Sequence, residues 1–120
     1  MRVVGAALLL SLLGLAGAPD ALAHAIVIDS TPPAGGVATG PDLTIELRFN
    51  SRIDHQRSRL ILYLADGSAR PLTQAMDVAP DVMVAKAVGL APGAYRLRWQ
   101  VLAVDGHITR GDIPFKVVAP

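Results

Sequence analysis

The sequence predicts an all-β fold, specifically a β-sandwich of about seven short strands. In several short segments, apolar and polar residues alternate with a period of two, and no segment shows a sustained helical period. Turns rich in glycine and proline separate these segments. The chain shows no internal repeat or linker, so we expect a single domain.

Residues 1–23 are expected to be a cleavable signal peptide. Met1 and Arg2 form a short basic start, residues 3–16 are apolar, and residues 21–23 (Ala-Leu-Ala) match the small-x-small pattern of a signal peptidase site. The apolar stretch is too short to span a membrane. Cleavage after Ala23 makes residues 24–120 an exported mature domain that begins with His24. A cut one or two residues away is the alternative.

The first half of the mature chain is expected to contain four strands. Residues 24–30 alternate and form the first, which the prolines and glycines of residues 31–36 end. Residues 43–49 alternate cleanly and form the second. The polar residues 50–57 are expected to be a loop. Residues 60–64 form the third strand, and the turn at residues 65–68 leads into a short fourth.

The second half is expected to contain three more strands. Residues 82–88 form the fifth, and a turn at residues 90–93 follows it. Residues 94–104 form the sixth and longest. Their alternation places Trp99 on the inward face, where it is expected to anchor the core. Residues 113–118 form the last strand.

The composition excludes several classes of function. The formal net charge is +1 at pH 7, and the charges are scattered, so the chain has no basic patch for nucleic acid and no polybasic membrane segment. There is no cysteine, which excludes disulfides, iron–sulfur clusters and thiolate metal sites. After cleavage only Met76 and Met83 remain, which argues against a methionine-rich Cu(I) site.

The tripeptide Asp105-Gly106-His107 follows the longest strand and allows two interpretations. Asp105 and His107 are two residues apart, so in extended backbone they project to the same side, as two metal ligands must. Asp-Gly is also a frequent hairpin turn, in which case His107 is simply solvated. The tripeptide alone does not decide between a metal site and a turn.

An N-terminal His24 gives the metal interpretation more weight. Its free α-amine and its ring Nδ1 can bind one metal together in a six-membered chelate ring. With His107 and the Asp105 carboxylate, the donors are three nitrogens and one oxygen. This set suits square-planar or tetragonal Cu(II), whereas Zn(II) prefers a tetrahedron.

Two other polar residues are expected to have no role in a metal site. His55 lies in the polar segment of residues 50–57 and is expected to be a solvated surface histidine. Asp29 lies near the end of the first strand and is expected to face solvent or cap a turn.

These features together resemble the CopC family of periplasmic copper-resistance and copper-trafficking proteins. The resemblance covers the whole mature chain and rests on several motifs, each of which is weak alone. They are His24, Ser30-Thr31-Pro32, Leu47-Arg48-Phe49, the strand Gly93-Ala94-Tyr95-Arg96-Leu97-Arg98-Trp99, Asp105-Gly106-His107, Gly111 and Phe115.

The resemblance implies an immunoglobulin-like or cupredoxin-like Greek-key β-sandwich with a Cu(II) site. The implied ligands are the N-terminal histidine brace of His24, Asp105 and His107. Some members add a methionine-rich Cu(I) loop, which this chain lacks, or a nearby glutamate, where this chain has Asn50 and Ser51. The resemblance also implies a CopD-like inner-membrane protein as a partner.

We therefore expect a periplasmic Cu(II) carrier or buffer that is not an enzyme. The sequence shows no nucleophile–base pair for catalysis. Two alternatives remain. One is a histidine-brace monooxygenase, which needs an open copper position and an aromatic surface for its substrate. The other is a metal-free sandwich module, which leaves the coincidence of His24 with Asp-Gly-His unexplained.

Overall fold

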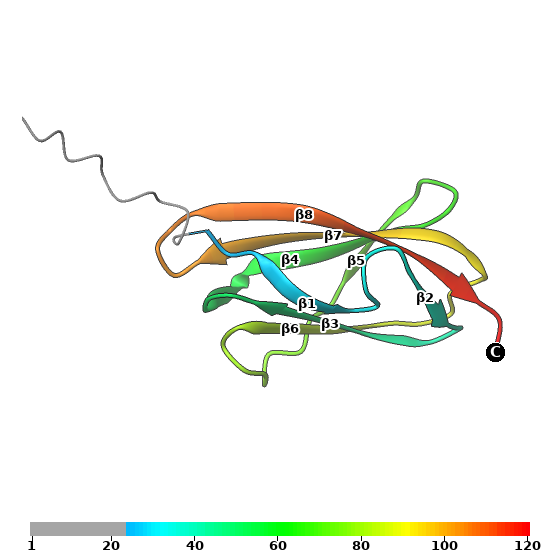
Figure 1. Ribbon diagram of the computed structural model, residues 1–120, viewed down its shortest axis with the longest axis horizontal. Helices are drawn as coiled ribbons and strands as arrows, with labels where there is room; N and C mark the ends of the chain where they lie inside the picture. The colour runs from blue at the N-terminus through cyan, green and yellow to red at the C-terminus, as the bar shows by residue number, and fades with distance from the viewer. Residues whose placement is uncertain (1–23) are drawn as a thin grey trace, which may run out of the picture.

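The computed structural model describes residues 24–120, which form eight strands in two sheets (Figure 1). The predicted all-β sandwich is confirmed, with one strand more than expected. The expected signal peptide lies outside the described residues. Among residues 24–120 we find no helix that could cross a membrane. The strands are β1 (Val27–Thr31), β2 (Gly36–Thr39), β3 (Leu43–Phe49), β4 (Ile53–Tyr63), β5 (Ala69–Leu72), β6 (Val82–Ala87), β7 (Gly93–Ala103) and β8 (Ile108–Val118).

The two sheets differ in size, and the chain passes between them repeatedly, as in a Greek-key sandwich. One sheet has the strand order β1-β3-β6, and the other has the order β2-β8-β7-β4-β5. Neighbouring strands are antiparallel except β2 and β8, which are parallel. The long hairpin β7–β8 runs along the molecule, so its turn lies at one end of the sandwich (Figure 1).

The core lies between the sheets and follows the predicted alternation. In β3 every second residue from Leu43 to Phe49 is buried, and the residues between them are exposed. Trp99 of β7 packs edge-on against Phe49, with ring centroids 5.4 Å apart, so it joins the two sheets as the predicted anchor. Gly111 of β8 leaves room for the indole, because a Cβ there would lie 2.6 Å from Cζ2 of Trp99.

One strand was not predicted, two begin earlier than predicted, and β1 begins at Val27 and not at residue 24. β2 was not predicted, because its glycine and neighbouring prolines suggest a break, yet its backbone pairs in parallel with β8. β8 begins at Ile108 rather than residue 113, since its exposed polar residues hide the pattern. β4 begins at Ile53, so most of the polar segment expected to be a loop belongs to a strand.

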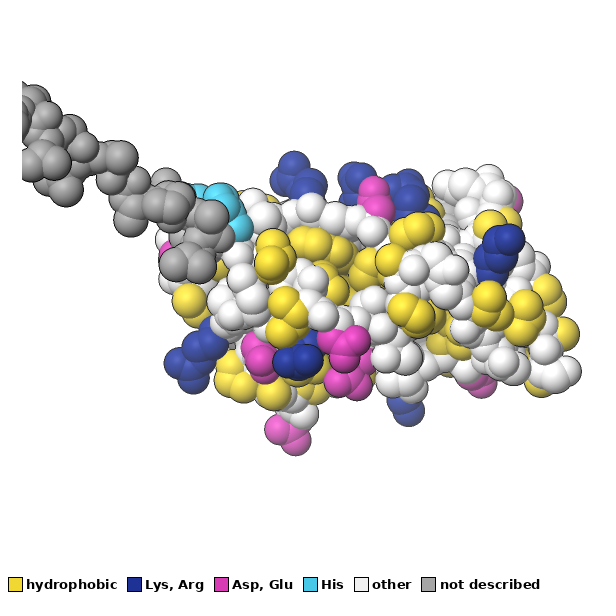
Figure 2. All heavy atoms as spheres, in the orientation of Figure 1, with side chains coloured by type: hydrophobic (Ala, Val, Ile, Leu, Met, Phe, Trp, Pro, Cys, Tyr) yellow, Lys and Arg dark blue, Asp and Glu magenta, His cyan; other side chains and the backbone are white. Residues whose placement is uncertain are grey.

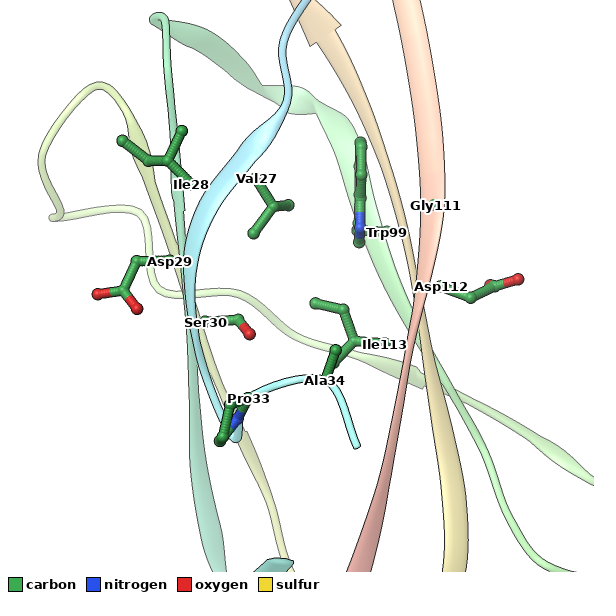
Figure 3. Close-up of a pocket in the computed structure, with 10 residues that line it drawn as sticks. All are labelled: Val27, Ile28, Asp29, Ser30, Pro33, Ala34, Trp99, Gly111, Asp112 and Ile113. Atoms are coloured by element: carbon green, nitrogen blue, oxygen red, sulfur yellow. The ribbon is translucent and has the colours of Figure 1, made fainter. Parts of the chain in front are cut away.

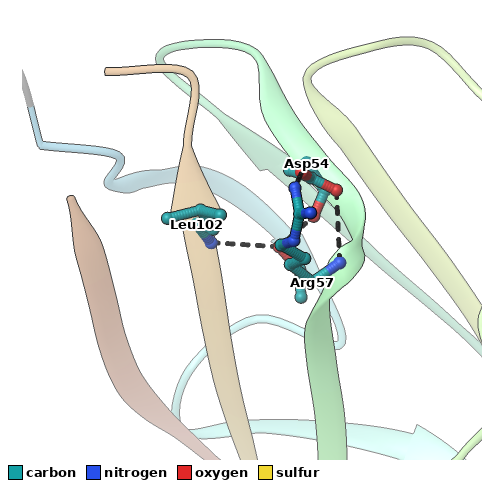
Figure 4. Close-up of polar contacts among 4 residues, drawn as sticks. Asp54, Arg57 and Leu102 are labelled. Atoms are coloured by element: carbon teal, nitrogen blue, oxygen red, sulfur yellow. Dashed lines mark hydrogen bonds and ion pairs between the residues drawn. The ribbon is translucent and has the colours of Figure 1, made fainter. Parts of the chain in front are cut away.

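The polar residues at the start of β4 form a bulge. The register between β4 and β7 shifts between Asp54 and Arg59. Within this bulge the buried hydroxyl of Ser58 donates to the Asp54 carbonyl and accepts from the Leu102 N–H at 3.0 Å. Arg57 pairs with the Asp54 carboxylate at 3.0 Å (Figure 4). The extra residues therefore have hydrogen-bond partners, which explains why a polar segment continues a strand.

His55 is not the solvated loop residue that the sequence suggested. It is partly buried in β4, and its ring Nε2–H donates to the carbonyl oxygen of Val82 at 2.6 Å. Val82 begins β6, so this hydrogen bond joins one sheet to the other. His55 therefore has a structural role. Asp29, by contrast, is exposed as expected.

Candidate metal centre

The Asp-Gly-His segment forms the hairpin turn between β7 and β8. Gly106 has a φ of +90°, a backbone conformation that residues with a Cβ rarely adopt. Its N–H donates to the Ala103 carbonyl at 2.9 Å, and the Ala103 N–H donates to the His107 carbonyl at 2.9 Å. The tripeptide therefore forms the hairpin turn, but the ring of His107 is not simply solvated, because it bonds to Asp105 and lies against the ring of His24. The same turn also brings the carboxylate and the imidazole together.

Within the turn, Asp105 accepts two hydrogen bonds from His107. The backbone N–H of His107 donates to Oδ1 at 3.1 Å, and ring Nδ1 donates to Oδ2 at 2.9 Å. These two bonds, the backbone one first, hold the pKa of the Asp105 carboxyl below its usual value. The carboxylate is thus charged near neutral pH, and it fixes the orientation of the ring. Nε2 is therefore the ring nitrogen of His107 that does not bond to Asp105.

His24 lies against this turn, although it is far away in sequence. Its ring meets the His107 ring edge-on, with centroids 5.2 Å apart and an angle of 61°. Figure 2 shows histidine side chains at the end of the molecule where the described chain begins. Ring Nδ1 of His24 is buried and has no hydrogen-bond partner. A buried polar nitrogen without a hydrogen-bond partner is costly unless something binds it.

The spacing of the two rings can be compared with the spacing that a shared metal ion requires. With metal–nitrogen bonds of about 2.0 Å, two imidazoles on one ion have centroids roughly 4.5 Å apart at adjacent positions and roughly 6.4 Å apart at opposite ones. The observed separation of 5.2 Å matches neither value, so a square-planar ion bound by both rings would require one ring to move. Among the described residues, no three His, Asp or Glu side chains already form a ligand set. The Asp105 carboxylate is occupied by His107, so direct ligation requires that bond to open.

Asn50 makes hydrogen bonds to the backbone of His24 and Ile26, a role that was not predicted from the sequence. Its Oδ1 accepts from the Ile26 N–H at 2.8 Å, and its Nδ2 donates to the His24 carbonyl at 3.3 Å. The available signal was an asparagine directly after the last alternating residue of β3, where side-chain amides often bond to backbone. Its partner could not be identified from local sequence.

A groove elsewhere on the surface bears on the enzyme alternative. It has a volume of about 460 Å³ and lies between β1 and the β7–β8 hairpin, beside Trp99 (Figure 3). None of the three predicted ligands lines it. The three predicted ligands therefore lie outside this groove.

The fold and the site together define a small β-sandwich protein with a candidate metal centre at one end. The CopC domain model matches residues 27–118. The chain therefore belongs to the CopC family, whose members are copper-binding and copper-transport proteins rather than enzymes. It is accordingly a copper-handling protein. The matched range includes Asp105 and His107 and begins after His24.

Solved structures support the same assignment. CopC from Methylosinus trichosporium OB3b is 26% identical and has a TM-score of 0.72, with 80% of this chain and 95% of that chain covered. PcoC from Escherichia coli, described as a methionine-rich copper resistance protein, is 25% identical with a TM-score of 0.64. That match covers 79% of this chain and 99% of PcoC.

Sequence relatives add a difference in length. The copper transport protein CutJ of Bacillus subtilis is 26% identical over 99 residues, which are 79% of this chain but only 18% of CutJ. YobA of Escherichia coli K12 is 28% identical over 102 residues, which are 82% of each chain. The chain thus spans about a fifth of CutJ and most of YobA.

Proposed function

We propose that the mature protein binds one Cu(II) ion in the periplasm and buffers it or passes it on. The proposed donors are the α-amine and Nδ1 of His24, the imidazole of His107 and the carboxylate of Asp105. The observation that most supports this proposal is the buried, unpartnered Nδ1 of His24 beside the His107 ring. A metal ion gives that nitrogen the partner it lacks.

The donor chemistry favours Cu(II) over Cu(I). Amine, imidazole and carboxylate are the ligands that Cu(II) prefers, whereas Cu(I) prefers thiolates and thioethers. The chain has no cysteine. Its two described methionines cannot easily share an ion, because Met83 is fully buried in the core and Met76 is exposed.

Asp105 contributes in two ways. In the structure it orients His107 by bonding to Nδ1, which is how carboxylates commonly support a metal-bound histidine. When it rotates away from that nitrogen, it can donate an oxygen to copper directly. In either arrangement its negative charge lies close to the ion and stabilises the more highly charged Cu(II).

The exposed position of the site suits transfer of the ion. The His107 side chain is half exposed at the tip of a turn, where a partner can reach it. We propose that a CopD-like inner-membrane protein is that partner. CutJ, a copper transport protein, contains the matching region within a much longer chain.

The decisive experiment compares two versions of the mature protein. One begins at His24, and the other has a single glycine in front of it. The extra residue converts the amine into an amide, which has no basic lone pair, while every side chain stays in place. We expect the extended protein to lose most of its Cu(II) affinity at neutral pH and some nitrogen coupling in electron paramagnetic resonance. Equal affinities would refute the amine ligand, and tight one-to-one binding of Cu(I) would refute the Cu(II) preference.

A further inference from the structure

The backbone of residues 24–26 lies beyond the residues of β1 that pair with β3. β1 begins at Val27, which pairs with Phe49, the last residue of β3. One more backbone hydrogen bond follows, from the Asn50 N–H to the Ile26 carbonyl at 3.0 Å. Beyond Asn50 the chain turns toward β4, and the Ile53 N–H donates to Pro80 instead. No further backbone of β3 is therefore available to pair with residues 24–26.

The side-chain amide of Asn50 replaces the missing backbone. Its oxygen accepts the Ile26 N–H at 2.8 Å, and its nitrogen donates to the His24 carbonyl at 3.3 Å. One amide thus supplies both an acceptor and a donor, as a peptide group of a continuing strand would. The antiparallel pairing extends as far as His24, although β3 has already ended.

We propose that Asn50 is a positioning residue for the copper site, which it preorganises by fixing the backbone of His24. This inference rests on the function proposed above. The first residues of a domain are usually poorly ordered unless they are tied down. Here the hydrogen bond from Asn50 reaches the His24 carbonyl, so the backbone of His24 is held beside the His107 turn before the metal arrives. Less conformational freedom is then lost on binding.

The two hydrogen bonds require both the oxygen and the nitrogen of a side-chain amide. An aspartate at position 50 keeps the acceptor for Ile26 but cannot donate to the His24 carbonyl. An alanine removes both hydrogen bonds and leaves the backbone bond from Asn50 N–H in place. Asn50 is exposed, so neither substitution creates a cavity in the core.

The test uses Asn50→Ala in the mature protein, with Ser30→Ala as a matched control. Ser30 of β1 also donates a side-chain hydrogen bond to backbone, to the carbonyl of Pro32 just after the strand at 3.0 Å, but this bond does not reach His24. We expect Asn50→Ala to weaken Cu(II) binding about tenfold and Ser30→Ala to leave it unchanged. The Ile26 amide should exchange faster with solvent in Asn50→Ala, with or without copper.

A double-mutant cycle separates positioning from a general structural effect. In a His24→Ala background the ring is lost, but the α-amine and the backbone carbonyl that Asn50 contacts remain, so Asn50→Ala should weaken the remaining affinity less than it does in the parent protein. An equal loss in both backgrounds, or unchanged Ile26 exchange and affinity in Asn50→Ala, would overturn the inference. If His24→Ala itself leaves the affinity unchanged, the proposed copper site is wrong, and that result is distinct from a failure of Asn50 alone.

Discussion

His107 is tied to Asp105 through both its backbone and its ring. The N–H and Nδ1 of one residue donate to the two carboxylate oxygens of the other, at 3.1 and 2.9 Å. Because the two residues belong to one turn, this pairing requires no other part of the fold. The imidazole is therefore oriented by its own hairpin, whereas His24 must be brought to it by the rest of the sandwich.

Asp105→Asn should weaken copper binding about 10- to 100-fold, the range typical of carboxylates that support metal-bound histidines. The asparagine oxygen can still accept one hydrogen bond from His107, but the negative charge beside the ion is lost. Competition titration with a chelator of known affinity measures the effect. An unchanged affinity would show that Asp105 neither binds the metal nor orients its ligand.

His107→Ala should reduce Cu(II) affinity by orders of magnitude while the apo-protein stays folded, since the side chain is half exposed at a turn. The matched variant is His55→Ala. It should leave affinity unchanged but destabilise the protein by about 1–2 kcal/mol, because the Val82 carbonyl loses its partner. Copper titration and urea denaturation of both variants test this. The opposite pattern would mean that the two histidines have been assigned the wrong roles.

Gly111→Ala should destabilise the protein by about 1–3 kcal/mol, the usual cost of overpacking a core. The new methyl group would lie 2.6 Å from Cζ2 of Trp99, so the indole must shift away from Phe49. Denaturation followed by tryptophan fluorescence measures both the stability and the change around the ring. Lys116→Ala on the same strand is exposed and serves as the control, with an expected change within about 0.5 kcal/mol. Equal stabilities of the two variants would contradict the close contact.

Asp112→Asn should lower stability by less than about 1 kcal/mol at neutral pH, as for other partly exposed ion pairs. The hydrogen bond from Arg98, with smaller contributions from Arg96, lowers the pKa of the Asp112 carboxyl in the folded protein. This stabilisation is therefore present above the unfolded pKa of about 3.9 and is lost as pH falls through the lower folded value. Melting curves of the two proteins should differ at pH 7 and converge at strongly acidic pH. A constant difference at all pH values would rule out this origin.

The strands could be predicted where the alternation of apolar and polar side chains indicates which residues are buried. In β3 the strict alternation from Leu43 to Phe49 identifies both the strand and its inward face. The start of β4 could not be found this way, because its bulge places polar side chains where they bond to backbone. β2 was missed because its pairing with β8 depends on backbone groups, which the sequence pattern does not report.

The candidate site likewise has a part that could be predicted from the sequence and a part that could not. The closeness of Asp105 and His107 could be predicted from their spacing, although they meet through the hydrogen bonds of a turn and not on one side of an extended strand. The approach of His24 to His107 was expected from the order of strands and from family resemblance, and the structure places the two rings in contact. The contacts of Asn50 join residues more than twenty positions apart, and no local pattern identifies such a pair.

The meeting of His24 and His107 has a consequence for how the protein unfolds. The two residues enclose nearly all of the strands, and the chain has no cysteine to cross-link them. A metal ion bound by both residues would act as a reversible cross-link that closes one large loop of the chain. A permanent cross-link around a loop of about 100 residues stabilises a protein by roughly 4–5 kcal/mol in the chain-entropy model. Loading with copper should therefore also protect the chain from proteolysis, and release of the ion should leave it easier to degrade.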